Sequence, residues 1–201
     1  MGQIRRVCVY CGSSPGRDPA FLAAATRLGE ALADAGVALV YGGGSAGMMG
    51  AVATGAQTRG GEIIGIIPGF LIGRENVFRG ATEVVVTKDM HERKRIMFER
   101  SDAFVALPGG IGTLEELVEQ ITWAQLGRHK KPILLANING FWNGLLDVFE
   151  HMAHNGYIHS AARLNFLVTE DVEKILPMLT AAAATLTEEE KAGEPASVQR
   201  M

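Results

Sequence analysis

The 201-residue sequence has only two cysteines, lacks any long hydrophobic run and has no excess of basic charge. Its 19 Lys and Arg residues against 22 Asp and Glu residues give a net charge of -3, so no overall positive field attracts nucleic acid or an anionic membrane. No apolar run approaches the roughly 20 residues of a membrane span, and the N-terminal one is too short for a signal peptide. These features predict a cytoplasmic protein whose partner is a small molecule, with neither nucleic acid nor membrane.

Cys8 and Cys11 have the CxxC spacing of redox and zinc sites. Both lie in the apolar run VCVYC, where strand geometry sends residues three apart to opposite faces. A redox pair needs its thiols together at a helix start, and zinc needs two further ligands, so we predict core packing. His151 and His154 can share a helix face but have no further obvious ligand, and no metal is expected.

Apolar, β-rich segments alternate with helical segments along the chain, which is the pattern of a parallel sheet covered on both faces. We predict one doubly wound, Rossmann-like α/β domain of about seven strands over residues 1–186, followed by a polar tail at 187–201 that we expect to be disordered. The expected strands are residues 4–11, 37–41, 63–68, 82–87, 103–108, 132–136 and 166–169. The expected helices are residues 21–36, 48–59, 90–100, 113–126, 141–155 and 172–184.

Glycine-rich turns follow the first, second and fifth expected strands, where ligands bind in sheets of this kind. The second turn, GGGSAG at residues 42–47, matches the dinucleotide fingerprint GxGxxG. That fingerprint belongs to the first βα turn and needs an acid at the end of the next strand, so no dinucleotide cofactor is expected. Gly43, Gly44 and Gly47 still free backbone N–H groups to face a phosphate or sugar, with a plain tight turn as the alternative. The stretch at residues 69–80 is long for a connection and suits a loop over a pocket.

The motif PGGIGTLEE at residues 108–116 is the sharper signal, because paired glycines, a third glycine and a threonine introduce a strongly helical run. It lacks the lysine of a Walker loop, so phosphate affinity has to come from backbone N–H groups, the helix N-terminus and the Thr113 hydroxyl. A capping box is the alternative, with Thr113 at the N-cap and Glu116 reaching back to it. Glu115 also suits a solvated first turn.

A basic helix is expected after Asp89, in the segment DMHERKRIMFERSD. With Asp89 at the N-cap, Arg93 lies on one side of this helix with Lys94 beside it. Basic runs on amphipathic helices are usually solvated. This one follows a strand at the edge where the glycine turns gather, which favours a ligand-facing Arg93.

Three segments, GGGSAGMMGAVA, MHERK and PGGxGTxxE, resemble in order and separation the Lonely Guy family of cytokinin-activating phosphoribohydrolases. Bacterial members of that family were often mislabelled lysine decarboxylases. The resemblance extends over residues 4–180, and the pairing of MHxRK with PGGxGTxxE is specific.

The resemblance implies hydrolysis of an N6-modified adenosine 5'-monophosphate to the free base and ribose 5-phosphate, without a cofactor. It implies that Arg93 and Glu116 are catalytic, and that the protein is at least a homodimer with active sites near the subunit interface. The implied substrate-binding residues are Glu75, Arg93, Lys94, Gly110, Ile111, Gly112, Thr113, Leu114, Glu115, Glu116 and Thr122.

The residue types suit this reaction. Breaking an N-glycosidic bond develops positive charge at the anomeric carbon and negative charge on the base, so a carboxylate and a fixed cation are useful. Glu116 can stabilise the sugar or orient water, whereas Arg93 is a poor proton donor better suited to electrostatic stabilisation. Asp89, His91 or water remain candidates for protonating the base. A nucleotide or molybdenum-cofactor carrier of similar fold is the alternative function, and pyridoxal phosphate-dependent decarboxylation has no separate support.

Overall fold

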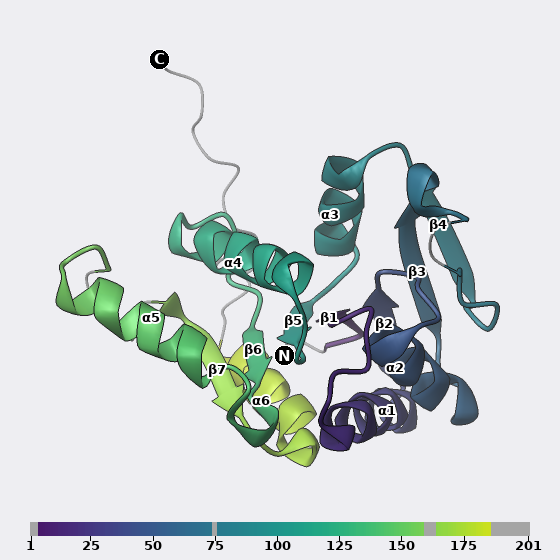
Figure 1. The fold of residues 1–201 in the computed structure, drawn as a ribbon, viewed down its shortest axis with the longest axis horizontal. Coiled ribbons are helices and arrows are strands. Elements are labelled where there is room, and N and C mark those ends of the chain that lie inside the picture. The colour runs from purple at the N-terminus through teal and green to yellow at the C-terminus, as the bar shows by residue number, and fades with distance from the viewer. Residues whose placement is uncertain (1–3, 74–75, 159–163, 186–201) are drawn as a thin grey trace.

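A seven-stranded, all-parallel sheet forms the centre of the protein, in a computed structural model that describes residues 4–73, 76–158 and 164–185 (Figure 1). The strand order is β4-β3-β2-β1-β5-β6-β7. The strands are β1 (Arg6–Tyr10), β2 (Ala38–Tyr41), β3 (Ile63–Pro68), β4 (Glu83–Thr87), β5 (Ala103–Ala106), β6 (Ile133–Ala136) and β7 (Phe166–Thr169). The predicted α/β class, strand number and approximate strand positions are confirmed.

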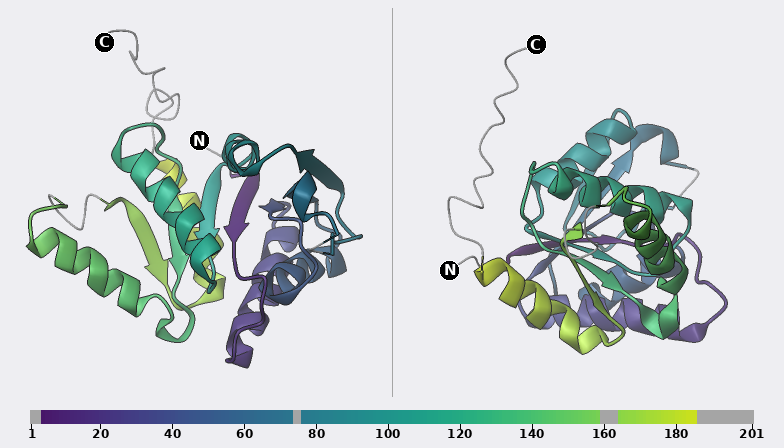
Figure 2. Two further views of the ribbon diagram at one scale, coloured as in Figure 1. Left: turned by 45° about the horizontal axis from the view of Figure 1, so that its top comes forward. Right: turned by 90° about the vertical axis from the view of Figure 1, so that its left-hand side faces the viewer.

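Within the residues that the structure describes, six α-helices cover the two faces of the sheet, three on each side (Figures 1 and 2). One face packs against α1 (Pro19–Asp34), α2 (Gly47–Thr58) and α6 (Val172–Ala184). The other face packs against α3 (Met90–Glu99), α4 (Ile111–Gln125) and α5 (Asn143–His154). Two short 3-10 turns, η1 (Gly69–Leu71) and η2 (Ile138–Gly140), lie in connections. No helix in the described part of the chain combines the length and apolarity needed to cross a bilayer.

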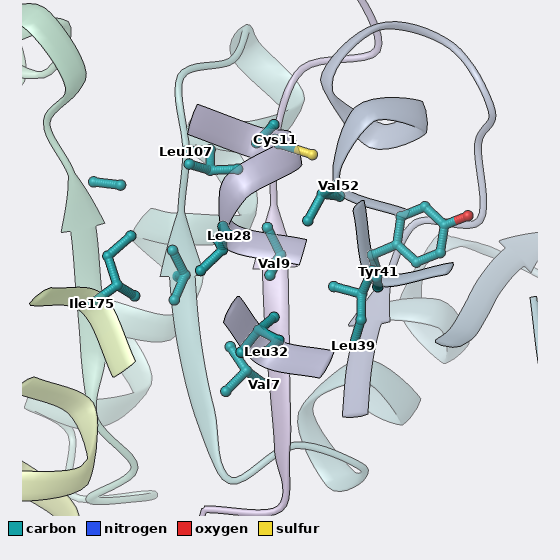
Figure 3. Close-up of a cluster of buried hydrophobic side chains, with 14 of the residues drawn as sticks. Val7, Val9, Cys11, Leu28, Leu32, Leu39, Tyr41, Val52, Leu107 and Ile175 are labelled. Carbon is teal, nitrogen blue, oxygen red and sulfur yellow. The ribbon is translucent and has the colours of Figure 1, made fainter. Parts of the chain in front are cut away.

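The central strand shows why a continuous apolar run fits between two helical layers. Successive side chains of β1 point to opposite faces. Val7, Val9 and then Cys11 enter the cluster beneath α1 and α2 (Figure 3), whereas Cys8 and Tyr10 enter the cluster beneath α3 and α4. Both cysteines are buried free thiols, so the prediction of core packing is confirmed.

The sheet reverses its winding direction between β1 and β5, which are neighbours. From β1 the chain builds outward through β2, β3 and β4, then returns to place β5 on the other side of β1. The turns that leave β1 and β5 therefore pass to opposite faces and open a crevice at the carboxyl edge of the sheet. Such a switch point is where open α/β sheets bind ligands.

Candidate functional site

A cavity of about 310 Å³ lies at this switch point and brings together residues from four segments. The turn after β1 contributes Cys11, Gly12 and Ser13, and α2 contributes Met49. Met90 and Arg93 enter from α3. The first turn and a half of α4 completes the lining with Gly110, Ile111, Gly112, Thr113, Glu115 and Glu116.

Helix α3 begins at the edge of this cavity, and its start is fixed by two local hydrogen bonds. Asp89 is the N-cap, and its carboxylate accepts a hydrogen bond from the Glu92 backbone N–H at 2.8 Å. The Glu92 side chain in turn accepts one from the backbone N–H of Lys88 at 2.8 Å. The predicted cap is confirmed, and this start places Arg93 one turn into the helix, on its buried side.

The Arg93 guanidinium is buried and held from three sides. Its Nε donates to the carbonyl oxygen of Ile66 in β3 at 3.1 Å, and its Nη1 lies 3.5 Å from Glu116 Oε1. Its Nη2 lies directly against Gly42, where even a β-carbon would overlap it. The first glycine of the GGGSAG turn therefore makes room for the arginine.

Helix α4 begins two residues earlier than predicted, and the capping-box interpretation is wrong. Gly110 is the N-cap and no side chain caps the helix, so Thr113 lies inside its first turn and Glu116 in its second. A β-carbon at Gly109 would overlap the Thr113 side chain, which fixes how closely the turn folds onto the helix. Glu116 consequently faces Arg93 and the cavity, away from its own helix start.

Glu116 carries a strongly shifted carboxyl group. Burial raises its pKa from the ordinary 4.5 to about 7, and the nearby positive charge of Arg93 opposes that rise without cancelling it. Burial also raises the pKa of the Cys11 thiol, which keeps this cavity-lining cysteine protonated. Glu116 therefore exchanges a proton with its surroundings near neutral pH, which is a property expected of a functional carboxyl group.

The other sequence-predicted residues lie in different places. Lys94 is not part of the cavity lining and forms ion pairs with Glu115 and Glu119. Leu114 packs into the apolar cluster beneath α3 and α4, and Thr122 is exposed further along α4. Glu75 lies outside the described residues.

The predicted glycine turn at residues 42–47 serves packing more than cavity lining. Gly43 accepts a hydrogen bond from the Phe78 N–H at 3.0 Å, and Ser45 donates to the carbonyl oxygen of Asn76 at 2.9 Å. The described part of the long 69–80 connection thus docks on this turn and lines a separate cavity of about 750 Å³. Gly47 adopts a positive φ of 55° where the turn meets Ser13 and Ser14.

Sequence reasoning missed Cys11, Gly12, Ser13, Met49 and Met90 as lining residues, and Gly42 as the support of Arg93. The glycine-rich turn after the first strand was a signal for Gly12 and Ser13. Met49 and Met90 are apolar helix residues, whose pattern indicates only burial. Within the described residues, no group of three or more His, Cys, Asp or Glu side chains is placed to hold a metal ion.

The fold and site together define a Rossmann-like α/β protein with a switch-point cavity, a glycine-rich turn leading into a helix, and a buried Arg–Glu pair. The chain belongs to the family whose model is described as possible lysine decarboxylase, which matches residues 49–179.

Relatives within this family have a more specific name. A probable cytokinin riboside 5'-monophosphate phosphoribohydrolase of Oryza sativa subsp. japonica is 46% identical over 91% of this chain and 80% of its own length. A cytokinin riboside 5'-monophosphate phosphoribohydrolase of Arabidopsis thaliana is 43% identical over 88% of this chain and 82% of its own. The resemblance to the Lonely Guy family is thereby confirmed.

Solved structures of lower sequence identity share the fold. The molybdenum cofactor carrier protein of Chlamydomonas reinhardtii superposes with a TM-score of 0.68 at 23% identity, covering 90% of this chain and 99% of its own. The molybdenum cofactor binding protein of Rippkaea orientalis gives 0.68 at 24% identity, covering 89% and 97%. At these identities the likeness concerns the fold alone.

Proposed function

We propose that the protein is a cytokinin riboside 5'-monophosphate phosphoribohydrolase, which releases free base and ribose 5-phosphate from an N6-modified adenosine 5'-monophosphate. The observation that carries the proposal is the buried Arg93–Glu116 pair inside the switch-point cavity. Relatives at 43–48% identity that are named for this activity support it.

The start of α4 is the proposed phosphate site. The first hydrogen bond of this helix runs from the Leu114 N–H to the Gly110 carbonyl oxygen, so the preceding N–H groups of the first turn lack intrahelical partners. These groups and the helix dipole favour an anion, and Gly110, Gly112 and Thr113 line the cavity there. Binding of a phosphate group at this helix start does not require a lysine, because the backbone N–H groups supply the hydrogen bonds.

Glu116 and Arg93 are the proposed catalytic pair. In its ionised form, Glu116 stabilises the positive charge that develops on the ribose and can accept a proton from the attacking water. Arg93 remains charged and supplies fixed electrostatic stabilisation beside it. Because the Glu116 pKa is about 7, the ionised and protonated forms are both accessible near neutral pH.

Product analysis tests this proposal. We expect purified protein to release base and ribose 5-phosphate from N6-isopentenyladenosine 5'-monophosphate or AMP, measured by liquid chromatography. The matching nucleosides, which lack the phosphate, serve as controls and should react far more slowly. Binding of both nucleotides without release of base contradicts the proposal and favours a carrier function instead.

Decarboxylation of an amino acid through a pyridoxal phosphate Schiff base does not suit this cavity. That chemistry needs a lysine amine at the reacting centre, and none of the residues lining the cavity is a lysine. The family description is therefore a poor guide to the reaction.

Assembly as a homodimer is a further part of the proposal. An apolar stripe runs along the outer side of α4 through Ile111 and Val118 to Leu126 at its end, and the exposed fractions of these residues are 81%, 38% and 77%. Ile111 also lines the cavity, so a second copy packed on this stripe would cover the site. Sedimentation equilibrium should give at least twice the chain mass of 21.5 kDa; a monomeric mass at micromolar concentration contradicts this assembly.

A cytoplasmic location stays a prediction from the sequence.

A further inference from the structure

The ammonium group of Lys94 joins α3 to α4 beside the residues that carry the Arg93–Glu116 pair. Its Nζ lies 2.6 Å from Glu115 Oε1 and 2.9 Å from Glu119 Oε1. The lysine side chain is only 12% exposed, and that of Glu119 only 21%. The charge of Lys94 is thus committed to two carboxylates and is shielded from solvent.

Lys94 is adjacent in sequence to Arg93 on α3, and its two partners flank Glu116 on α4. Arg93, Glu115 and Glu116 line the cavity, whereas Lys94 does not. A substrate in the cavity would meet the arginine, and the lysine would act on it only through its neighbours.

We infer that Lys94 is a positioning residue for the reaction: by joining Glu115 and Glu119 to α3, it fixes the approach of Arg93 to Glu116 and offsets the negative charge on both sides of Glu116. This inference rests on the proposed function for its kinetic consequence. Its structural consequence, a change in the environment of Glu116, can be measured without any substrate.

The charges around Glu116 show what removing Lys94 does. The charged groups facing it are Arg93 and Lys94 from α3 and Glu115 and Glu119 from α4. The other ionisable groups nearby are Cys8 and Tyr10 of β1 and Cys11 of the turn that follows it. Burial raises the pKa of these two thiols and of the Tyr10 hydroxyl, so all three stay neutral. Two cations and two carboxylates therefore surround Glu116, and without Lys94 one cation would be left with two carboxylates. The pKa of Glu116 should then rise, because Lys94 lowers it and Glu115 and Glu119 raise it.

The primary test is a carbon-13 NMR titration of the Glu116 carboxyl group in the full-length protein without ligand. Lys94→Met should move the titration midpoint upward from about 7, by roughly half a unit to one unit, the scale of one unit charge lost nearby at intermediate effective dielectric. Lys94→Arg keeps the charge and should leave the midpoint near that of the original protein. Glu119→Gln, in a chain that retains Lys94, should move the midpoint downward, which tests the network even if Lys94→Met fails to fold.

Kinetics separates positioning from substrate binding. In Lys94→Met, the pH at which kcat is half-maximal should rise with the NMR midpoint while KM changes less than about twofold, and adding Glu119→Gln should reverse much of the shift. An unmoved midpoint with a KM raised tenfold or more overturns the inference and makes Lys94 a substrate ligand. If the unaltered protein hydrolyses no nucleotide, the proposed function fails, and the NMR titration still decides the role of Lys94.

Discussion

Glu116→Gln is expected to lower turnover by about 100-fold or more while the protein still binds the nucleotide. The amide has nearly the shape of the carboxyl group but cannot carry the negative charge that opposes the developing charge on the sugar. Loss of one such transition-state contact costs on the order of 100-fold. Steady-state kinetics with N6-isopentenyladenosine 5'-monophosphate, together with a calorimetric binding isotherm, measures both quantities. Near-normal turnover would remove Glu116 from the mechanism.

The free energy of unfolding of the Glu116→Gln variant provides a control, because the direction of its change follows from the Glu116 pKa. The pKa of Glu116 is raised in the folded protein to about 7, from 4.5. The unfolded chain therefore loses this proton first, and the free energy of unfolding falls as the pH rises from about 4.5 through 7. Glutamine does not ionise, so the variant should gain stability relative to the original protein between pH 5 and pH 8, by at most about 3 kcal/mol.

A capping role would give a different result. Glutamine also fills the N3 position of a capping box, so Glu116→Gln would then leave the stability nearly unchanged. Denaturant unfolding at pH 5 and pH 8 separates the two outcomes. A stability that shows no gain for the variant at either pH would contradict the buried environment that raises the pKa of Glu116.

The sequence predicts the sheet well because its strands are continuous apolar runs between helical segments. Residues 63–68 and 166–169 are strands with the predicted bounds, and Asp89 caps α3 as expected. The predicted start of α4 fails for a physical reason. Glycine has poor helix propensity, so Gly112 favours a later start, yet the turn at Gly109 and Gly110 sets the backbone for a helix from Ile111.

The site is predicted in part, because its motifs indicate residue chemistry but not contacts between distant segments. Arg93 and Glu116 are identifiable, and the structure places them 3.5 Å apart. The role of Gly42 depends on an overlap with a guanidinium 51 positions away in the chain, which no local pattern encodes. Lys94 carries the charge expected of a phosphate ligand, and only the packing of α3 against α4 shows that two carboxylates already neutralise it.

Arg93→Met and Arg93→Lys are both expected to lower turnover by about 100-fold or more. Methionine removes the charge. Lysine retains it, but one ammonium group cannot reproduce the fork in which Nε binds the Ile66 carbonyl oxygen and Nη1 faces Glu116. Arg93→Met should also raise the pKa of Glu116, since the arginine lowers it. Kinetic pH profiles of both variants measure these effects, and a lysine variant with near-normal turnover would reduce the role of Arg93 to charge alone.

Gly42→Ala provides a second route to the same loss without changing Arg93 itself. The new β-carbon would overlap Arg93 Nη2, so the guanidinium has to leave the position in which Nη1 faces Glu116, and turnover should fall by at least about tenfold. Gly144→Ala is the matched control, because a β-carbon at that helical position meets no atom within 4 Å. Combining Gly42→Ala with Arg93→Met should cost little more than Arg93→Met alone, because both changes disable one contact. Additive losses in the double variant would mean that Gly42 acts on the reaction by some path other than Arg93.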